Sequence, residues 1–176
     1  MTLIGEVAGH LHAGGVSFAL VGAAALAAHG VARASLDIDL LVTDLRVLDP
    51  EFWRSVSART AVEVRRGDAD DPLAGVVRCG VGSLRPVDVV VGRHRWQREA
   101  IERAEPVTVE EVTLPVVTAV DLVLLKLFAG GIQDELDIRL LLATSGGEVI
   151  ARKVDTAAAV LPESAQALWN RLMSGP

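Results

Sequence analysis

The feature that most constrains this chain is the segment LDIDLLV, residues 36–42. Its first half alternates apolar residues with aspartate and its second half is apolar throughout. This pattern predicts a strand with one face buried along its length and the other face open at one end. Residues two apart on a strand project to the same side, so Asp37 and Asp39 would have Cα atoms about 7 Å apart on one face. The chain therefore has to bring two carboxylates into one space.

A strand, a turn and a helix are predicted just before this segment. Residues 16–21 are apolar and largely favour a strand, residues 23–28 are rich in alanine and favour a helix, and Gly30 would stop that helix. At such a turn, free backbone N–H groups and the helix dipole make an anion site, and Gly22 would let a phosphate come close. A lone glycine more commonly just ends a strand, so the spacing to the aspartates decides between the two interpretations.

The remaining pattern places strands mainly in the first two thirds of the chain and helices in the last third. Strands are expected at 61–66, 76–81 and 87–91, with one or two more within 107–114. A helix is expected up to residue 58, with Asp49 as its cap and Pro50 at its first position. Further helices are expected at 93–104, from Thr118 to the break at 129–131, and as two or three helices within 133–173. This distribution predicts an α+β fold, in which a mixed twisted sheet is flanked by helices and followed by a short C-terminal helical annex. We expect residues 1–117 to form the sheet core and residues 118–176 to pack on it in one compact unit.

Composition excludes several classes of protein. Half of the residues (51%) are hydrophobic, which argues against intrinsic disorder. The net charge of −6 argues against a broad, sequence-independent grip on nucleic acid. The single cysteine, Cys79, cannot form an internal disulfide. The first residues lack the pattern of a secretory signal, and the apolar stretch 16–31 falls short of the ~20 residues that a bilayer core demands. A cytoplasmic protein is therefore expected.

A third carboxylate, Asp88, lies early in the predicted strand 87–91 and could come alongside the first two. Carboxylates that face one space repel each other unless a cation lies between them, and Mg²⁺ accepts such oxygen ligands together with substrate phosphates and water. The alternative is that Asp37 and Asp39 only keep an edge strand soluble. The pair by itself supports both interpretations about equally.

The stretch VGAAALAAHGVARASLDIDLLV resembles the signature of the polymerase-beta-type nucleotidyltransferase superfamily. That signature has a Gly followed by Gly or Ser, an interval of roughly ten residues, and then Asp-x-Asp or Asp-x-Glu on a strand. The alanine-rich helix, His29-Gly30 and Arg33-Ala34-Ser35 are most similar to the AbiEii-like group, which includes nucleotidyltransferase toxins of toxin–antitoxin pairs. The fold implied is the nucleotidyltransferase type of mixed sheet.

The resemblance continues in DLVLLKLFAGGIQDELDIRLLL, residues 121–142, where Lys126, Asp134 and Asp137 match the group. Two positions depart from it. Ala23 stands where Gly or Ser is usual, so a serine hydroxyl for phosphate is missing, and Gly131 stands where Arg is common.

The resemblance implies roles for particular residues. Asp37, Asp39 and Asp88 would bind Mg²⁺, with two ions expected, and Asp88 would orient or deprotonate the attacking hydroxyl. The triphosphate of a nucleoside triphosphate would lie on the turn at Gly22 and Ala23. Further nucleotide contacts are expected from Arg33, Ser35 and Lys126. Without the resemblance, Lys126 is more simply a lysine at the flank of a helix, and Asp134 and Asp137 would hold its helix in place.

The implied reaction moves a nucleoside monophosphate from a triphosphate to a hydroxyl with release of pyrophosphate. The leading hypothesis for the acceptor is an RNA end such as that of tRNA, with the chain acting as a toxin that has a cognate antitoxin. The alternatives are a small molecule, as in aminoglycoside-type enzymes, and a nucleotide-binding or partner module with weak turnover. A basic cluster within 93–103, which surrounds Trp96, could bind RNA, although a solvated helix face is the simpler interpretation.

Overall fold

The structure of this chain is a computed structural model that describes residues 2–80, 82–83, 85–109 and 112–174. Across these residues, seven strands form one mixed sheet in the order β3-β4-β5-β2-β1-β7-β6. Their bounds are β1 (Phe18–Val21), β2 (Ile38–Val42), β3 (Val62–Arg66), β4 (Leu73–Cys79), β5 (Val87–Gly92), β6 (Glu105–Val109) and β7 (Val112–Val116). Strand β2 runs parallel to β5 and antiparallel to β1, and β1 runs parallel to β7. The α+β fold class is confirmed.

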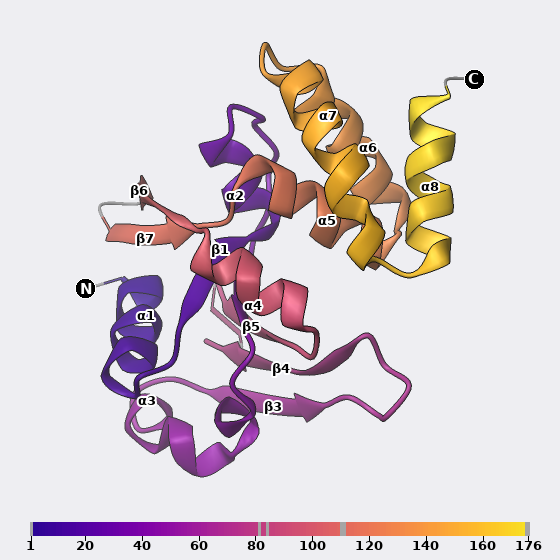
Figure 1. The fold of residues 1–176 in the computed structure, drawn as a ribbon. Helices are drawn as coiled ribbons and strands as arrows, with labels where there is room; N and C mark the ends of the chain where they lie inside the picture. The colour runs from indigo at the N-terminus through magenta and orange to yellow at the C-terminus, as the bar shows by residue number, and fades with distance from the viewer. Residues whose placement is uncertain (1, 81, 84, 110–111, 175–176) are drawn as a thin grey trace.

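Helices contact the sheet along much of its width and extend beyond it (Figure 1). The α-helices are α1 (Leu3–Ala13), α2 (Gly22–Ala28), α3 (Arg54–Ser57), α4 (Arg95–Glu102), α5 (Ala119–Ala129), α6 (Ile132–Leu142), α7 (Gly147–Ala157) and α8 (Glu163–Met173). Short 3₁₀ turns are η1 (Leu45–Leu48), η2 (Pro50–Trp53) and η3 (Ala158–Val160). Helices α6, α7 and α8 pack around α5, which in turn contacts α2. The C-terminal helical annex is thus present, while the division of the chain at residue 117 stays a prediction.

Local chemistry accounts for the bounds of the central helix of this annex. Thr118 caps α5 by accepting the backbone N–H of Asp121, and its hydroxyl donates to the Asp121 carboxylate. Gly130 ends the helix in the left-handed conformation, at φ +67°, which glycine adopts without strain. The predicted start and stop of this helix are both confirmed.

Several predicted elements need correction. The strand expected at 36–42 begins at Ile38, so Asp37 precedes the strand instead of lying on it. The predicted cap Asp49 and first position Pro50 are confirmed, but the expected single helix is divided into the 3₁₀ turn η2 and the short helix α3. The strand expected at 76–81 begins earlier, at Leu73, and its predicted last residue, Val81, lies outside the described residues. The strands within 107–114 are two, β6 and β7, and residues 110–111 between them are likewise not described.

Helix α1 is an element that the sequence pattern did not predict. Two glycines, Gly5 and Gly9, weaken its intrinsic helix propensity. Burial of Ile4, Val7 and Leu11 against the rest of the core accounts for its formation. Tertiary packing therefore overrides local preference here.

Over the described residues, no helix is long and apolar enough to cross a membrane.

Strand β2 carries buried apolar side chains, and this allows a direct test of the fold. Leu41 on β2 has 1% of its surface exposed, whereas Leu45, just beyond the strand, has 62% exposed. We expect Leu41→Ala to lower the free energy of unfolding by about 3 kcal/mol, because it removes buried methyl groups and leaves a cavity. Leu45→Ala should change it by less than about 0.5 kcal/mol. Urea unfolding of both variants measures the difference, and equal effects would contradict the position of β2 at the centre of the sheet.

Candidate active site

Three carboxylates meet at the end of β2, as the sequence predicted. One oxygen each from Asp37, Asp39 and Asp88 lies within 4.8 Å of the others. Asp88 is buried, and Asp37 and Asp39 are partly buried. A set of hard oxygen donors at this separation fits Mg²⁺, which takes oxygen ligands.

The sheet register explains why Asp88 reaches the other two carboxylates. Asp39 on β2 is the direct partner of Asp88 on the parallel strand β5. On its other side, Asp39 is the partner of Val21, the last residue of β1. Partners in register project to the same face of a sheet, so β1 and β5 together fix the position of the Asp39 side chain.

Gly22 follows Val21 and lies directly against this cluster. Its backbone has φ +64°, a conformation that residues with side chains rarely adopt. A Cβ atom at this position would lie 2.1 Å from Oδ2 of Asp39. Glycine is therefore needed here for two reasons, the turn from β1 into α2 and the close approach of the Asp39 carboxylate.

The environments of the two aspartates differ, and their pKa values move in opposite directions. Burial, together with the nearby carboxylates of Asp37 and Asp88, raises the pKa of Asp39 to about 6. The Ser35 hydroxyl donates a hydrogen bond to Oδ1 of Asp37, and this bond, with help from nearby arginines, lowers the pKa of Asp37. Asp37 is thus held as a carboxylate, while ionisation of Asp39 is opposed by burial and by the neighbouring carboxylates.

The other predicted nucleotide contacts are engaged with protein groups. The Lys126 ammonium is buried and lies 2.6 Å from Oδ2 of Asp137 and 3.1 Å from Oδ1 of Asp134. The Arg33 guanidinium binds the same Asp137 oxygen at 2.8 Å. Although burial opposes ionisation of Asp137, hydrogen bonds from Lys126 and Gln133 hold its pKa below the usual range. The interpretation that Asp134 and Asp137 hold the Lys126 helix fits these contacts, and nucleotide binding by Lys126, Arg33 and Ser35 stays a prediction.

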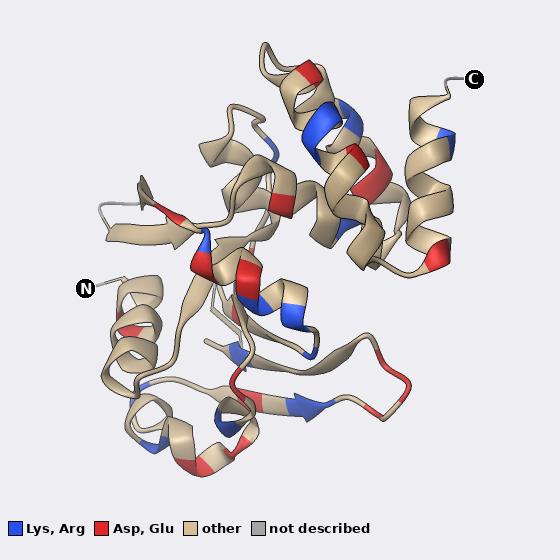
Figure 2. Ribbon diagram, in the orientation of Figure 1, with Lys and Arg blue, Asp and Glu red and all other residues tan. Residues whose placement is uncertain are grey.

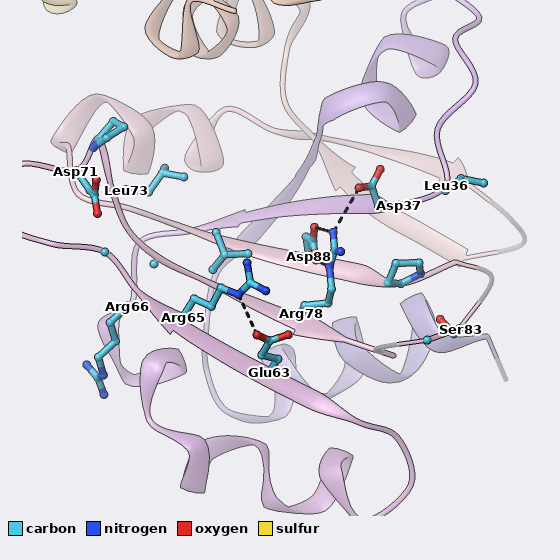
Figure 3. A pocket seen from close by; sticks show the side chains of 16 residues that line it. Leu36, Asp37, Glu63, Arg65, Arg66, Asp71, Leu73, Arg78, Ser83 and Asp88 are labelled. Atoms are coloured by element: carbon cyan, nitrogen blue, oxygen red, sulfur yellow. Dashed lines mark hydrogen bonds and ion pairs between the residues drawn. The ribbon is translucent and has the colours of Figure 1, made fainter.

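Two cavities flank the carboxylates. The smaller, about 420 Å³, is lined by predicted nucleotide-binding residues, among them Ala23, Arg33 and Ser35. The larger, about 920 Å³, lies over β3, β4 and β5 and includes Asp88 in its lining (Figure 3). Asp37 lines both cavities. Asp37 therefore stands at the boundary between two spaces that each could hold a reactant, and Asp88 adjoins the larger of them.

Arg78 is a residue of this site that the sequence pattern did not indicate. It lies on β4 in register with Asp88, and its Nε donates to Oδ1 of Asp88 at 2.7 Å while its Nη2 donates to Oδ2 at 2.5 Å. Nη2 also lies 3.6 Å from Oδ2 of Asp37. The local sequence around Arg78 does not indicate a role in the site, because only the pairing of β4 with β5 brings Arg78 to the aspartates.

The basic cluster around Trp96 is largely bound to the protein itself. Arg93 donates to backbone carbonyls of residues 67–69, Arg95 pairs with Glu99, and Arg103 pairs with the buried Asp121. Figure 2 shows basic and acidic positions mixed along α4. These contacts favour the interpretation of a solvated helix face over an RNA-binding patch.

Nearly the whole chain matches one known protein family. Residues 1–174 match the family described as nucleotidyl transferase of unknown function (DUF2204). The chain belongs to this family. It is a nucleotidyltransferase, and the superfamily indicated by the Gly22 turn and the acidic strand is confirmed. The narrower resemblance to the AbiEii-like group stays a prediction. Among curated proteins, none matches the sequence.

Solved structures agree with the family at the level of the fold. The solution structure of the antibiotic-resistance factor ANT(2'')-Ia is similar with a TM-score of 0.60 at 13% identity, over 98% of this chain and 96% of that one. The crystal structure of ANT(2'')-Ia in complex with adenylyl-2''-tobramycin is similar with a TM-score of 0.57 at 15% identity, over 89% of this chain and 93% of that one. The nucleotidyltransferase type of sheet is therefore confirmed.

The contact between Gly22 and Asp39 can be separated from backbone strain. Gly22 and Gly30 both have positive φ, but a Cβ atom on Gly30 would meet nothing within 4 Å. We expect both Gly22→Ala and Gly30→Ala to lower the free energy of unfolding by about 1 kcal/mol through strain. Gly22→Ala should also weaken Mn²⁺ binding, because the methyl group displaces the Asp39 carboxylate. Calorimetric Mn²⁺ titration checks this, and equal affinities of the two variants would contradict the contact.

The raised pKa of Asp39 predicts a pH-dependent stability. Ionising Asp39 is harder in the folded than in the unfolded chain, so its contribution is full below its usual pKa of 3.8 and is lost as pH rises through about 6. Asp39→Asn should therefore be more stable than the wild type by about 2 kcal/mol near neutral pH, and the gain should shrink toward ~pH 4. Urea unfolding without divalent ions across this range measures the gain. If Asp39→Asn is less stable than the wild type near neutral pH, Asp39 is not destabilised by repulsion from Asp37 and Asp88.

Proposed function

We propose that this chain transfers a nucleoside monophosphate from a nucleoside triphosphate to a hydroxyl of a small-molecule acceptor, in a reaction that depends on a divalent metal ion. The observation that carries the proposal is the place of the carboxylates between two cavities, with Asp37 in the lining of both. A transfer between two substrates needs its charge-stabilising groups where the substrates meet.

The smaller cavity suits the donor. It adjoins Ala23, next to the glycine turn, and contains Arg33, which binds Asp137 through one nitrogen and has further N–H groups, and Ser35, whose hydroxyl would have to leave Asp37 to donate to a phosphate. Phosphate oxygens take hydrogen bonds from groups of both kinds. Because Ala23 brings no hydroxyl, the backbone of the turn and these two residues would carry the contact that a serine provides elsewhere in the superfamily.

The larger cavity suits the acceptor. Its volume of about 920 Å³ lies in the range of small-molecule sites. Its polar lining includes Glu63, Asp71 and Arg65, so it offers both signs of charge to a polar ligand. The fold also accommodates adenylyl-2''-tobramycin in ANT(2'')-Ia. The engaged state of the arginines near Trp96 favours a small molecule over an RNA end, which remains the second candidate.

The chain's residues would divide the work as follows. Asp37, Asp39 and Asp88 would hold Mg²⁺, which when bound neutralises charge on the phosphates and lowers the pKa of the attacking hydroxyl. The hydroxyl oxygen forms a bond to the α-phosphorus, the bond from that phosphorus to the bridging oxygen breaks, and pyrophosphate leaves. Asp88, in the lining of the acceptor cavity, would orient the hydroxyl and accept its proton.

A labelling experiment identifies the donor and the acceptor together. The purified chain is incubated with Mg²⁺, each α-labelled ribonucleoside triphosphate in turn, and either a pool of small metabolites and aminoglycosides or total RNA. We expect label in the small-molecule pool and pyrophosphate in equal amount. Asp39→Asn should lower the rate by roughly a hundredfold or more, because it removes one charge that binds the cation. The matched control is Asp49→Asn. Asp49 caps the 3₁₀ turn η2 and is not one of the three carboxylates, and asparagine also caps well, so this variant should keep the rate.

The outcomes separate the candidates. Label on RNA would replace the small-molecule acceptor with an RNA end, and growth arrest that a neighbouring gene product relieves would then support the toxin hypothesis. Nucleotide binding without label on either pool would favour the weak-turnover module. The cognate antitoxin and the cytoplasmic location stay predictions.

A further inference from the structure

A row of charged residues runs across the sheet on the side of the acceptor cavity. Register pairs join Asp39 on β2 to Asp88 on β5, Asp88 to Arg78 on β4, and Arg78 to Glu63 on β3. Within this row, Arg78 contacts the carboxylate cluster. Figure 3 shows its guanidinium between Asp88 and Asp37.

The contact of Arg78 with Asp88 is a planar fork. Nε and Nη2 each donate to a different oxygen of the carboxylate, at 2.7 and 2.5 Å. Two parallel hydrogen bonds fix the plane of a carboxylate as well as its position, which a single bond cannot do. Asp88 is therefore held in one orientation relative to Asp39.

Burial distinguishes this pair from ordinary ion pairs on the same surface. The side chain of Asp88 is 12% exposed and that of Arg78 is 44% exposed. On the neighbouring strand, Arg65 pairs with Glu63 in the same cavity, but there the exposed fractions are 77% and 45%. An exposed pair contributes little, whereas a buried carboxylate depends strongly on its partner.

The charge of Arg78 also acts on the cluster as a whole. Three carboxylates within 4.8 Å of one another carry up to three negative charges, and one guanidinium in contact with two of them offsets one of those charges. A fixed positive charge beside the cluster repels any divalent cation that enters it. Arg78 thus lowers the cluster's affinity for metal ions while it keeps Asp88 close to the other carboxylates.

We propose that Arg78 is a positioning residue of the transfer reaction: its fork orients Asp88 toward the acceptor, and its charge weakens divalent-metal binding by the three aspartates. The role of the fork in orienting Asp88 rests on the proposed function, whereas the effect of the charge concerns metal binding alone. The two effects depend on different properties of the side chain, since any cation supplies charge and only arginine supplies the fork.

Three variants separate charge from geometry. Arg78→Met removes both, Arg78→Lys keeps the charge without the fork, and Arg65→Met removes the same charge from the exposed pair in the same cavity. Mn²⁺ binding is measured by electron paramagnetic resonance in the absence of nucleotide, and transfer is measured as kcat and KM for the acceptor found by labelling. Circular dichroism and urea unfolding establish that each variant is folded.

We expect Arg78→Met to bind Mn²⁺ roughly tenfold more tightly than the wild type, because a nearby positive charge is gone. Arg78→Lys should bind Mn²⁺ within about twofold of the wild type yet lose roughly tenfold or more in kcat, with little change in KM, because a point charge does not orient the carboxylate. Arg65→Met should bind Mn²⁺ as tightly as the wild type, because its charge lies in an exposed pair outside the three aspartates.

Other results overturn the inference. Unchanged Mn²⁺ affinity in Arg78→Met refutes the effect of charge, and full kcat in Arg78→Lys refutes the role of the fork. If Arg78→Met does not fold, Arg78→Lys alone decides through its kcat. Mn²⁺ binding to Arg78→Met but not to the wild type would support the inference on charge while contradicting the proposed metal-dependent function. Binding to neither would overturn both.

Discussion

Repulsion between the carboxylates of Asp37, Asp39 and Asp88 is the interaction that the surrounding structure has to offset. One oxygen from each lies within 4.8 Å of the others, in a partly buried place where water screens them weakly. Asp37 is stabilised by the Ser35 hydroxyl and Asp88 by the Arg78 fork. Among the described residues no side-chain donor bonds to Asp39, and burial together with the other two carboxylates raises its pKa to about 6. The site is therefore built to gain free energy when a cation binds.

A second set of charges connects the C-terminal helices to the loop before β2. The buried Asp137 on α6 accepts hydrogen bonds from Lys126 on α5 and from Arg33 in that loop. Because Arg33 lies in the same loop as Ser35 and Asp37, the position of α6 influences how the loop presents the first carboxylate. The annex is thus part of the support of the site, and the negative charge of Asp137 is fully offset by its partners.

The elements that the sequence predicted well are those with a strong local signal. The helix after the glycine turn, the capped helix from Thr118 and the glycine break at 129–131 depend on residues close together in the chain. Helix α1 was missed, because burial of Ile4 and Val7 decides it and burial is set by distant elements. The same limit applies to the site, where the aspartates were predicted and Arg78 was not.

The sequence by itself determined the turn at Gly22 and the strand that carries Asp39, since a positive φ at glycine and alternation along a strand are properties of neighbouring residues. Only the tertiary structure decided that Asp88 stands opposite Asp39, that Arg78 stands opposite Asp88, and that Lys126 faces Asp137. Asp39 and Asp88 are remote in the chain, and the other two pairs join consecutive elements whose packing no local pattern fixes. The register of the strands is set by backbone hydrogen bonds and by packing of the apolar core, and a shift of one residue would turn their side chains to the other face of the sheet.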